Sequence, residues 1–215
     1  MADFERYEYL PTGSITFSST ARSFGPKLIT ITVAGDSDDG AIDGDLTWRQ
    51  SGEAGNLGWF GEYSDNKEYF SYFRFALPSA LLDGYNVLDS RINIYGHNIW
   101  NWNGDTDALI IYGEDVSDAT VVGGGDTHPT EGGNQRSLTS ASVVWSESGS
   151  GDTGLVWNVS GLNTSTNIKT IIQELIDDNT GLSSGANIQL WLTINAVREE
   201  SVEVGYQDYA KVGDS

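Results

Sequence analysis

One segment near the C-terminal end of the chain has the pattern of an amphipathic helix. Its apolar residues recur at spacings of three and four, which places them in one stripe along a helix. They are Ile168, Ile171, Ile172, Leu175 and Ile176. Thr166 is a candidate cap for the start, and Asn179 followed by Gly181 supplies a usual stop. The sequence therefore predicts a helix near residues 166–179.

The rest of the chain is patterned as short strands between clusters of Gly, Asn, Asp and Ser. An aromatic and glycine-rich segment, 47–68, is predicted to be a long surface loop. A chain with many strands and one helix favours an all-β sandwich in which the helix covers one end or edge. The predicted strands are 28–34, 69–77, 87–96, 107–115, 141–145, 154–159, 186–194 and 201–206.

Composition agrees with one folded domain. A chain of 215 residues buries roughly 70% of its unfolded surface, and 7 Trp, 10 Tyr and 7 Phe supply large core residues. The chain has 0 Cys, which excludes disulfides and thiolate metal sites. It has no apolar run long enough to span a membrane. The first residues carry acids and aromatics in place of a signal peptide, which predicts synthesis in a cytoplasm, unless a leader has been removed.

Two parts are expected, a segment 1–27 and a sandwich domain 28–215. The first segment carries an aromatic patch, and aromatic residues are typical anchors in protein interfaces. The segment is predicted to be an arm that docks on a protein partner. The alternative is that it forms the first strand of the sandwich. The docking residues predicted here are Phe4, Tyr7, Tyr9 and Leu10.

The charge is strongly negative, with 31 acidic against 11 basic residues and a net charge of −20. Such a surface repels nucleic acid and anionic lipid, which need Lys and Arg for binding. Five aspartates lie within residues 35–45, where Gly40 and Gly44 can bend the chain. Ca²⁺ prefers such carboxylate and carbonyl oxygens, although the spacing is not that of an EF-hand. The segment is interpreted either as a Ca²⁺ site or as a solvated acidic turn. The candidate Ca²⁺ ligands are Asp36, Asp38, Asp39, Asp43 and Asp45.

The sequence offers only weak candidates for a catalytic site. His97 and His128 are the only histidines, and neither has a partner at a metal-ligand or catalytic-triad spacing. Carboxylate pairs for glycoside hydrolysis are too abundant to be informative among 31 acids. The sequence predicts a protein that is not an enzyme.

Four tryptophans lie in or beside predicted loops. Flat aromatic rings in loops can stack on sugars, which would make a cell-surface glycan the ligand. The alternative is that long loops fold back and bury their aromatic residues in small satellite clusters. The candidate ligand-binding residues are Trp48, Trp59, Trp100 and Trp102.

Six pieces of the sequence carry a resemblance when taken in order, and they are 37–40, 73–96, 109–122, 136–145, 171–193 and 198–201. Together they resemble a jelly-roll module. It occurs as repeats in large secreted bacterial proteins and as a unit in phage and prophage virion proteins, and it is distantly similar to carbohydrate-binding modules. The departures are Leu182 in place of the family's Trp, the aromatic insert 47–68, which has no counterpart, and a poorly matched closing strand. The resemblance implies a jelly-roll sandwich in which Arg198 has a structural role, as a partly buried arginine paired with a carboxylate. Arg74, which lies between Phe73 and Phe75, is expected to have a similar role.

The leading hypothesis is a non-catalytic structural and binding protein of a phage virion, made in the host cytoplasm. It would be a head-decoration, head-fibre or tail-fibre subunit that contacts other virion subunits or forms a homo-oligomer. The second hypothesis is a carbohydrate-binding or adhesin module of a secreted, extracellular bacterial protein. The third is a glycan-active enzyme.

Overall fold

The structure is a computed structural model that divides the chain into two compact units, Met1–Thr30 and Ile31–Ser215. Nearly all of the described residues belong to the second unit, and the fold is that of Ile31–Ser215. The structure describes residues 28–34, 37–42, 48–50, 61–63, 67–98, 109–123, 129, 135–145, 162–194 and 209–211.

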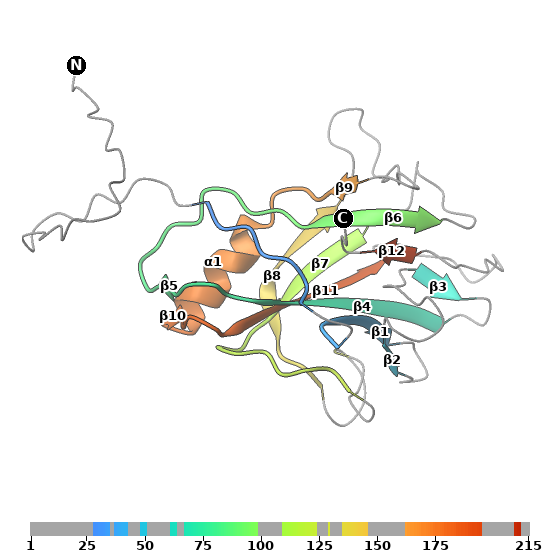
Figure 1. Cartoon of the computed structure of the whole chain (residues 1–215), viewed down its shortest axis with the longest axis horizontal. Coiled ribbons are helices and arrows are strands. Elements are labelled where there is room, and N and C mark those ends of the chain that lie inside the picture. The colour runs from blue at the N-terminus through green and yellow to red at the C-terminus, as the bar shows by residue number, and fades with distance from the viewer. Residues whose placement is uncertain are drawn as a thin grey trace, which may run out of the picture. The chain divides into compact units, whose positions relative to one another are not determined.

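The largest sheet among the described residues has seven antiparallel strands in the order β2-β1-β4-β11-β7-β8, with β3 paired to β4 (Figure 1). Within this sheet β11 pairs with β4 on one side and with β7 on the other. β11 is therefore the centre of this main sheet. Its strands are β1 (Asp39–Ile42), β2 (Trp48–Gln50), β3 (Gly61–Tyr63), β4 (Lys67–Ala76), β7 (Leu109–Glu114), β8 (Leu138–Trp145) and β11 (Asn187–Ile194).

Two smaller antiparallel sheets and one helix complete the described fold. A three-stranded sheet has the order β12-β6-β9, and a two-stranded sheet joins β10 to β5. The helix is α1, Lys169–Asp178. The structure is thus all-β with one short helix, as the sequence predicts. The bounds of the small strands are β5 (Leu81–Leu82), β6 (Asn93–Asn98), β9 (Leu162–Thr164), β10 (Gly181–Leu182) and β12 (Tyr209–Lys211).

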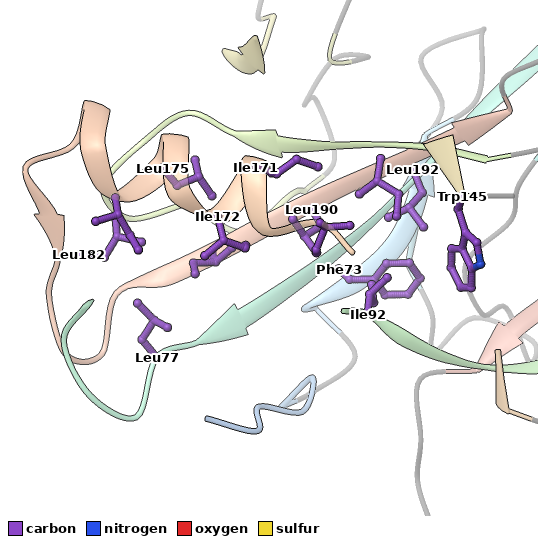
Figure 2. Packing of buried hydrophobic residues seen from close by; sticks show 14 of the residues in the cluster. Phe73, Leu77, Ile92, Trp145, Ile171, Ile172, Leu175, Leu182, Leu190 and Leu192 are labelled. Atoms are coloured by element: carbon purple, nitrogen blue, oxygen red, sulfur yellow. The ribbon is translucent and has the colours of Figure 1, made fainter. Parts of the chain in front are cut away.

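The main core lies on one face of the main sheet. Strand residues alternate between faces, so Leu190 and Leu192 of β11 point into this core together with Phe73 of β4. Figure 2 shows the buried side chains of α1 directed toward the sheet. Ile92 and Ile94 join the same cluster from the β6 side. Both α1 and the three-stranded sheet therefore cover the same face of the main sheet.

A second buried cluster lies on the opposite face. Trp191 of β11 and Tyr72 of β4 are fully buried there, with ring centroids 5.5 Å apart and planes tilted by 51°. Ile42, Phe70 and Val122 complete the cluster. Both faces of the central strands therefore carry buried apolar residues, as in the successive buried positions Leu190, Trp191 and Leu192 of β11.

The helix begins three residues later than the predicted start at Thr166. The Thr166 hydroxyl donates to the backbone oxygen of Val144 (2.9 Å), so it does not cap the helix. The carboxamide oxygen of Asn167 instead accepts the backbone N–H of Lys169 (3.0 Å) and that of Ser90 (3.1 Å). The predicted cap was wrong because Thr166 is used to hold a neighbouring strand.

The predicted helix stop is confirmed. Asn179 is the C-terminal cap, Thr180 adopts a φ of 53°, and Gly181 follows with a φ of 90°. A Cβ at Gly181 would lie 2.8 Å from the backbone nitrogen of Asp83 and 2.9 Å from the oxygen of Leu81. Glycine is therefore required where the chain leaves α1 and pairs with β5.

Several strand predictions need correction. Residues 28–34 form no strand, although Ile31 and Val33 pack against the core, because alternation reports one-sided burial and not backbone pairing. Residues 87–92 are likewise outside any strand, while the predicted loop 47–68 contains β2 and β3. β1 lies inside the acidic segment 35–45. The predicted strands 154–159 and 201–206 lie outside the described residues.

Candidate functional site

The predicted acidic site is described only in part. Asp38 forms an ion pair with Arg74, so its carboxylate already has a cationic partner. Asp39 is buried at the start of β1, opposite Phe73 of β4. The other three predicted ligands, Asp36, Asp43 and Asp45, lie outside the described residues. The Ca²⁺ site stays a prediction.

Most of the predicted contact residues also lie outside the described part of the chain. The backbone of Trp48 is described: this residue begins β2 and pairs with Ile42 of β1. It is therefore in a strand and not in the predicted loop. His97 lies in β6. The residues outside are Trp59, Trp100, Trp102, His128, Phe4, Tyr7, Tyr9 and Leu10.

The described residues contain neither a metal-binding cluster nor a membrane-spanning helix. No group of three or more His, Cys, Asp or Glu side chains is placed to hold a metal ion among them. No helix in the part of the chain that the structure describes is long and apolar enough to cross a membrane.

The structure instead brings together a row of polar side chains on the sheet face opposite α1. Gln189 of β11 is directly opposite Arg74 of β4 in the register. On its other side Gln189 donates to Glu114 of β7 (2.7 Å). Asp38 extends the row beyond Arg74, and Arg136 extends it beyond Glu114. We call these five residues the polar row.

Glu114 is the most completely bonded member of the polar row. It is 4% exposed, and one oxygen accepts Nη1 of Arg136 at 2.9 Å. The other oxygen accepts Nε2 of Gln189 at 2.7 Å and Nε1 of Trp191 at 3.2 Å. A buried carboxylate with an Arg partner and two further donors is a structural anchor. With both oxygens occupied, Glu114 is poorly suited to act as a general base.

The other end of the polar row is built around Arg74. Its Nη1 bonds to Asp38, and its Nε donates to the backbone oxygen of Ala119 at 2.9 Å. The Arg74 side chain is 16% exposed and that of Asp38 is 14% exposed. A paired arginine with a structural role was the expectation for Arg74, and these contacts confirm it.

Both arginines hold one segment, residues 115–123, which crosses this face without regular secondary structure. We call it the clamped loop. Arg74 binds the Ala119 oxygen, and Arg136 donates to the hydroxyl (3.1 Å) and oxygen (3.4 Å) of Thr120. Backbone carbonyls in a loop need such partners when the loop lies against a buried surface. The two arginines therefore supply hydrogen bonds of the kind that a neighbouring strand supplies in a sheet.

Asn187, at the start of β11, fixes the middle of the clamped loop. Its backbone N–H and its side-chain amide both donate to the Asp118 carboxylate at 2.8 Å. The backbone oxygen of Asn187 accepts the N–H of Ala119 at 2.9 Å. The side-chain bond from Asn187, followed by its backbone bond, lowers the pKa of Asp118 below its ordinary value of 3.8. The nearby charge of Arg74 acts in the same direction, while partial burial opposes it.

This arrangement holds a loop in place. Ala119 and Val122 turn inward and are buried, whereas Ser117, Thr120 and Val121 stay exposed. The side-chain oxygen of Gln189 is the one buried side-chain atom without a hydrogen-bond partner among the described residues. The polar row therefore supports a fixed surface loop.

The sequence analysis missed Glu114, Arg136 and Gln189. The available signal was a polar residue at an inward position of an apolar strand. Gln189 lies between Ile188 and Leu190 in β11, and Glu114 ends the apolar run of β7. A polar side chain buried between two such strands needs a partner, but the sequence does not say which strands are neighbours.

The comparisons with known proteins gave no assignment. No protein-family model matches this chain, and neither a curated protein nor a solved structure matches it.

Proposed function

We propose that this chain is a non-catalytic structural and binding protein. The observation that carries the proposal is the use of the buried polar groups. Glu114, Arg136 and Arg74 are all bonded to their neighbours or to the clamped loop. A catalytic carboxylate has to reach a substrate proton, whereas Glu114 is 4% exposed and both of its oxygens accept hydrogen bonds from neighbouring side chains.

The finer fold that we propose is a jelly-roll sandwich. The support is the order of the six sequence pieces, together with a main sheet and a three-stranded sheet that share one core. The helix covers the same core face as the three-stranded sheet. Fold alone does not define function, so the function rests on the surface features.

The particular role that we propose is a subunit exposed on a phage virion, as a head decoration, head fibre or tail fibre. The clamped loop supports this role because a loop fixed by two arginines can present its outer side chains without ordering on contact. The net charge of −20 supports it as well, since like-charged particles do not adhere to one another. Segment 1–27 would make the contact with other subunits.

The test is to locate the protein. An antibody against the folded chain is applied to purified particles from the producing culture and imaged after immunogold labelling. We expect label on particle surfaces. Label in the secreted fraction or on cell surfaces, without particles, contradicts the virion role and supports the extracellular carbohydrate-binding module.

A second measurement separates binding from catalysis. The chain is applied to a glycan array and incubated with the glycans that it binds, and the products are analysed by mass spectrometry. Binding without cleavage agrees with the proposal. Cleavage that survives purification to homogeneity would overturn the non-catalytic assignment.

A further inference from the structure

The outer edge of β8 carries backbone groups that face away from the main sheet. β8 is the last strand in the sheet order. In an antiparallel ladder, every second residue turns both of its backbone groups away from its neighbour. The oxygen of Val144 accepts a bond from Thr166 on the outer side, so Ser142, two residues earlier, also faces outward. Open edges of this kind can add another strand.

Glu174 of α1 closes one end of this edge. Its two carboxylate oxygens accept the backbone N–H groups of Ser140 at 2.5 Å and Ala141 at 2.7 Å. Two adjacent residues can point to the same side here because the β7–β8 register shifts between Tyr112 and Glu114. The carboxylate thus occupies the positions that a neighbouring strand's carbonyl oxygens would take.

Thr166 closes the other end through its bond to Val144. Ser142 lies between the two contacts, and the hydrogen bonds of the described residues leave its outer backbone groups without a partner. The segment 166–174 therefore covers β8 at both ends and leaves one residue open. One open residue is too short for a stable strand pairing.

The sequence of β8 explains why such a cover is needed. The strand reads LTSASVVW and contains no charged residue and no proline, which are the usual protections of an edge strand. Its β-branched and aromatic residues favour strand pairing. Val144 is also 40% exposed. The protection against pairing comes from another element, α1, and the preceding turn.

We propose that Glu174, with Thr166, keeps the β8 edge closed against a second copy of this chain. A second copy fits because β8 can pair antiparallel with itself around a two-fold axis at Ser142. Such an interface would be limited to a dimer, because each β8 edge would be paired with the other and no third copy could add to it. The strand has no charge of its own, so no like charges face each other across the pair. The bodies would still repel through their net charge of −20, and salt screens that repulsion.

The experiment uses the full chain, whose content of 0 Cys makes an introduced cysteine unique. Ser142→Cys reports β8–β8 pairing, because paired residues at the two-fold axis are close enough for a disulfide. It is combined with Glu174→Gln, which removes the carboxylate. The matched control is Asp178→Asn, which removes the same charge from the same helix at an exposed position without a described bond to β8.

The expected result is at least about tenfold more disulfide-linked dimer in E174Q/S142C than in D178N/S142C, because bonds to a charged acceptor are among the stronger ones. The difference should grow from low to high salt. Equal cross-linking in the two variants, whether weak or strong, would overturn the proposal.

If circular dichroism shows that E174Q does not fold, Thr166→Val replaces it. This variant keeps the side-chain shape and removes only the bond to Val144. It opens the other end of β8, so T166V/S142C should form more dimer than S142C alone. An unchanged dimer fraction would then contradict the proposal.

Discussion

At the residue scale, the backbone of Thr180 is under local strain. Its φ of 53° is in the left-handed region, which costs a β-branched residue about 1–2 kcal/mol. Asn adopts this region readily, so Thr180→Asn should raise the free energy of unfolding by about 0.5–1 kcal/mol. Thermal unfolding should show a Tm increase of roughly 1–4 °C. Thr170→Asn, an exposed position within α1, should give no increase.

Asp118 provides a prediction for pH dependence. The bonds from Asn187 lower its pKa in the folded protein, so its contribution to stability is present above about pH 4. That contribution is lost as the pH falls through the lowered pKa, because the folded state then has to take up the proton. Urea unfolding of the wild type and of Asp118→Asn should differ most near pH 7. The two should converge once the pH falls below the lowered pKa of Asp118, and a difference that stays constant from pH 7 through acid unfolding would contradict the assignment.

Single residues were predictable where their type conflicts with the surroundings. Arg74 between Phe73 and Phe75 indicated a paired arginine, and the structure provides Asp38 and the Ala119 oxygen. Glu114 was not predictable, because its partners Gln189 and Arg136 come from distant parts of the chain. Local patterns identify a buried polar group, whereas its partner depends on strand order.

At the element scale, the approach of α1 to the main sheet depends on Gly113. A Cβ there would lie 2.8 Å from Cγ2 of Ile171 and 3.2 Å from Cδ1 of Leu175. Gly113→Ala should therefore lower the free energy of unfolding by about 1–3 kcal/mol, the usual cost of overpacking. Chemical denaturation measures this change.

The control for Gly113 is a double-mutant cycle with Ile171→Ala, which removes the clashing group. In that background the added methyl of Gly113→Ala should cost much less, because it occupies part of the new space. Equal costs in both backgrounds would show that the helix approach is not limited at Gly113.

Elements were predictable where the hydrophobic pattern agrees with the residues that typically end a helix or strand. The apolar stripe and the stop at Asn179 located α1, and the short apolar run in 186–194 located β11. β1 was not predictable, since Asp39 and Gly40 are typical of loops and become a strand only by pairing with β4. Residues 28–34 show the reverse case, with alternation but no ladder.

At the scale of the whole molecule, the net charge of −20 makes cation binding a testable expectation. A Ca²⁺ site in the acidic segment should raise the Tm by roughly 5–10 °C when Ca²⁺ is about a hundredfold above its Kd after EDTA treatment. Asp36→Asn with Asp43→Asn should abolish the shift, and His97→Ala should not. Because Asp38 is paired with Arg74, Asp38→Asn should affect stability even without Ca²⁺. An unchanged Tm in the wild type would rule out the site.

The last prediction concerns attachment through the segment 1–27. Ile31–Ser215 forms a compact unit, and Ile31 and Val33 pack against its core, so a deletion of residues 2–25 leaves those contacts in place. The truncated chain should fold with cooperative unfolding and an unchanged circular dichroism spectrum. It should fail to assemble, because the aromatic anchors Phe4, Tyr7 and Tyr9 are gone and aromatic anchors carry much of the energy of protein interfaces. Analytical ultracentrifugation and binding to purified particles measure assembly. Normal assembly of the truncated chain would refute the docking arm, whereas loss of folding would show that the segment is part of the sandwich.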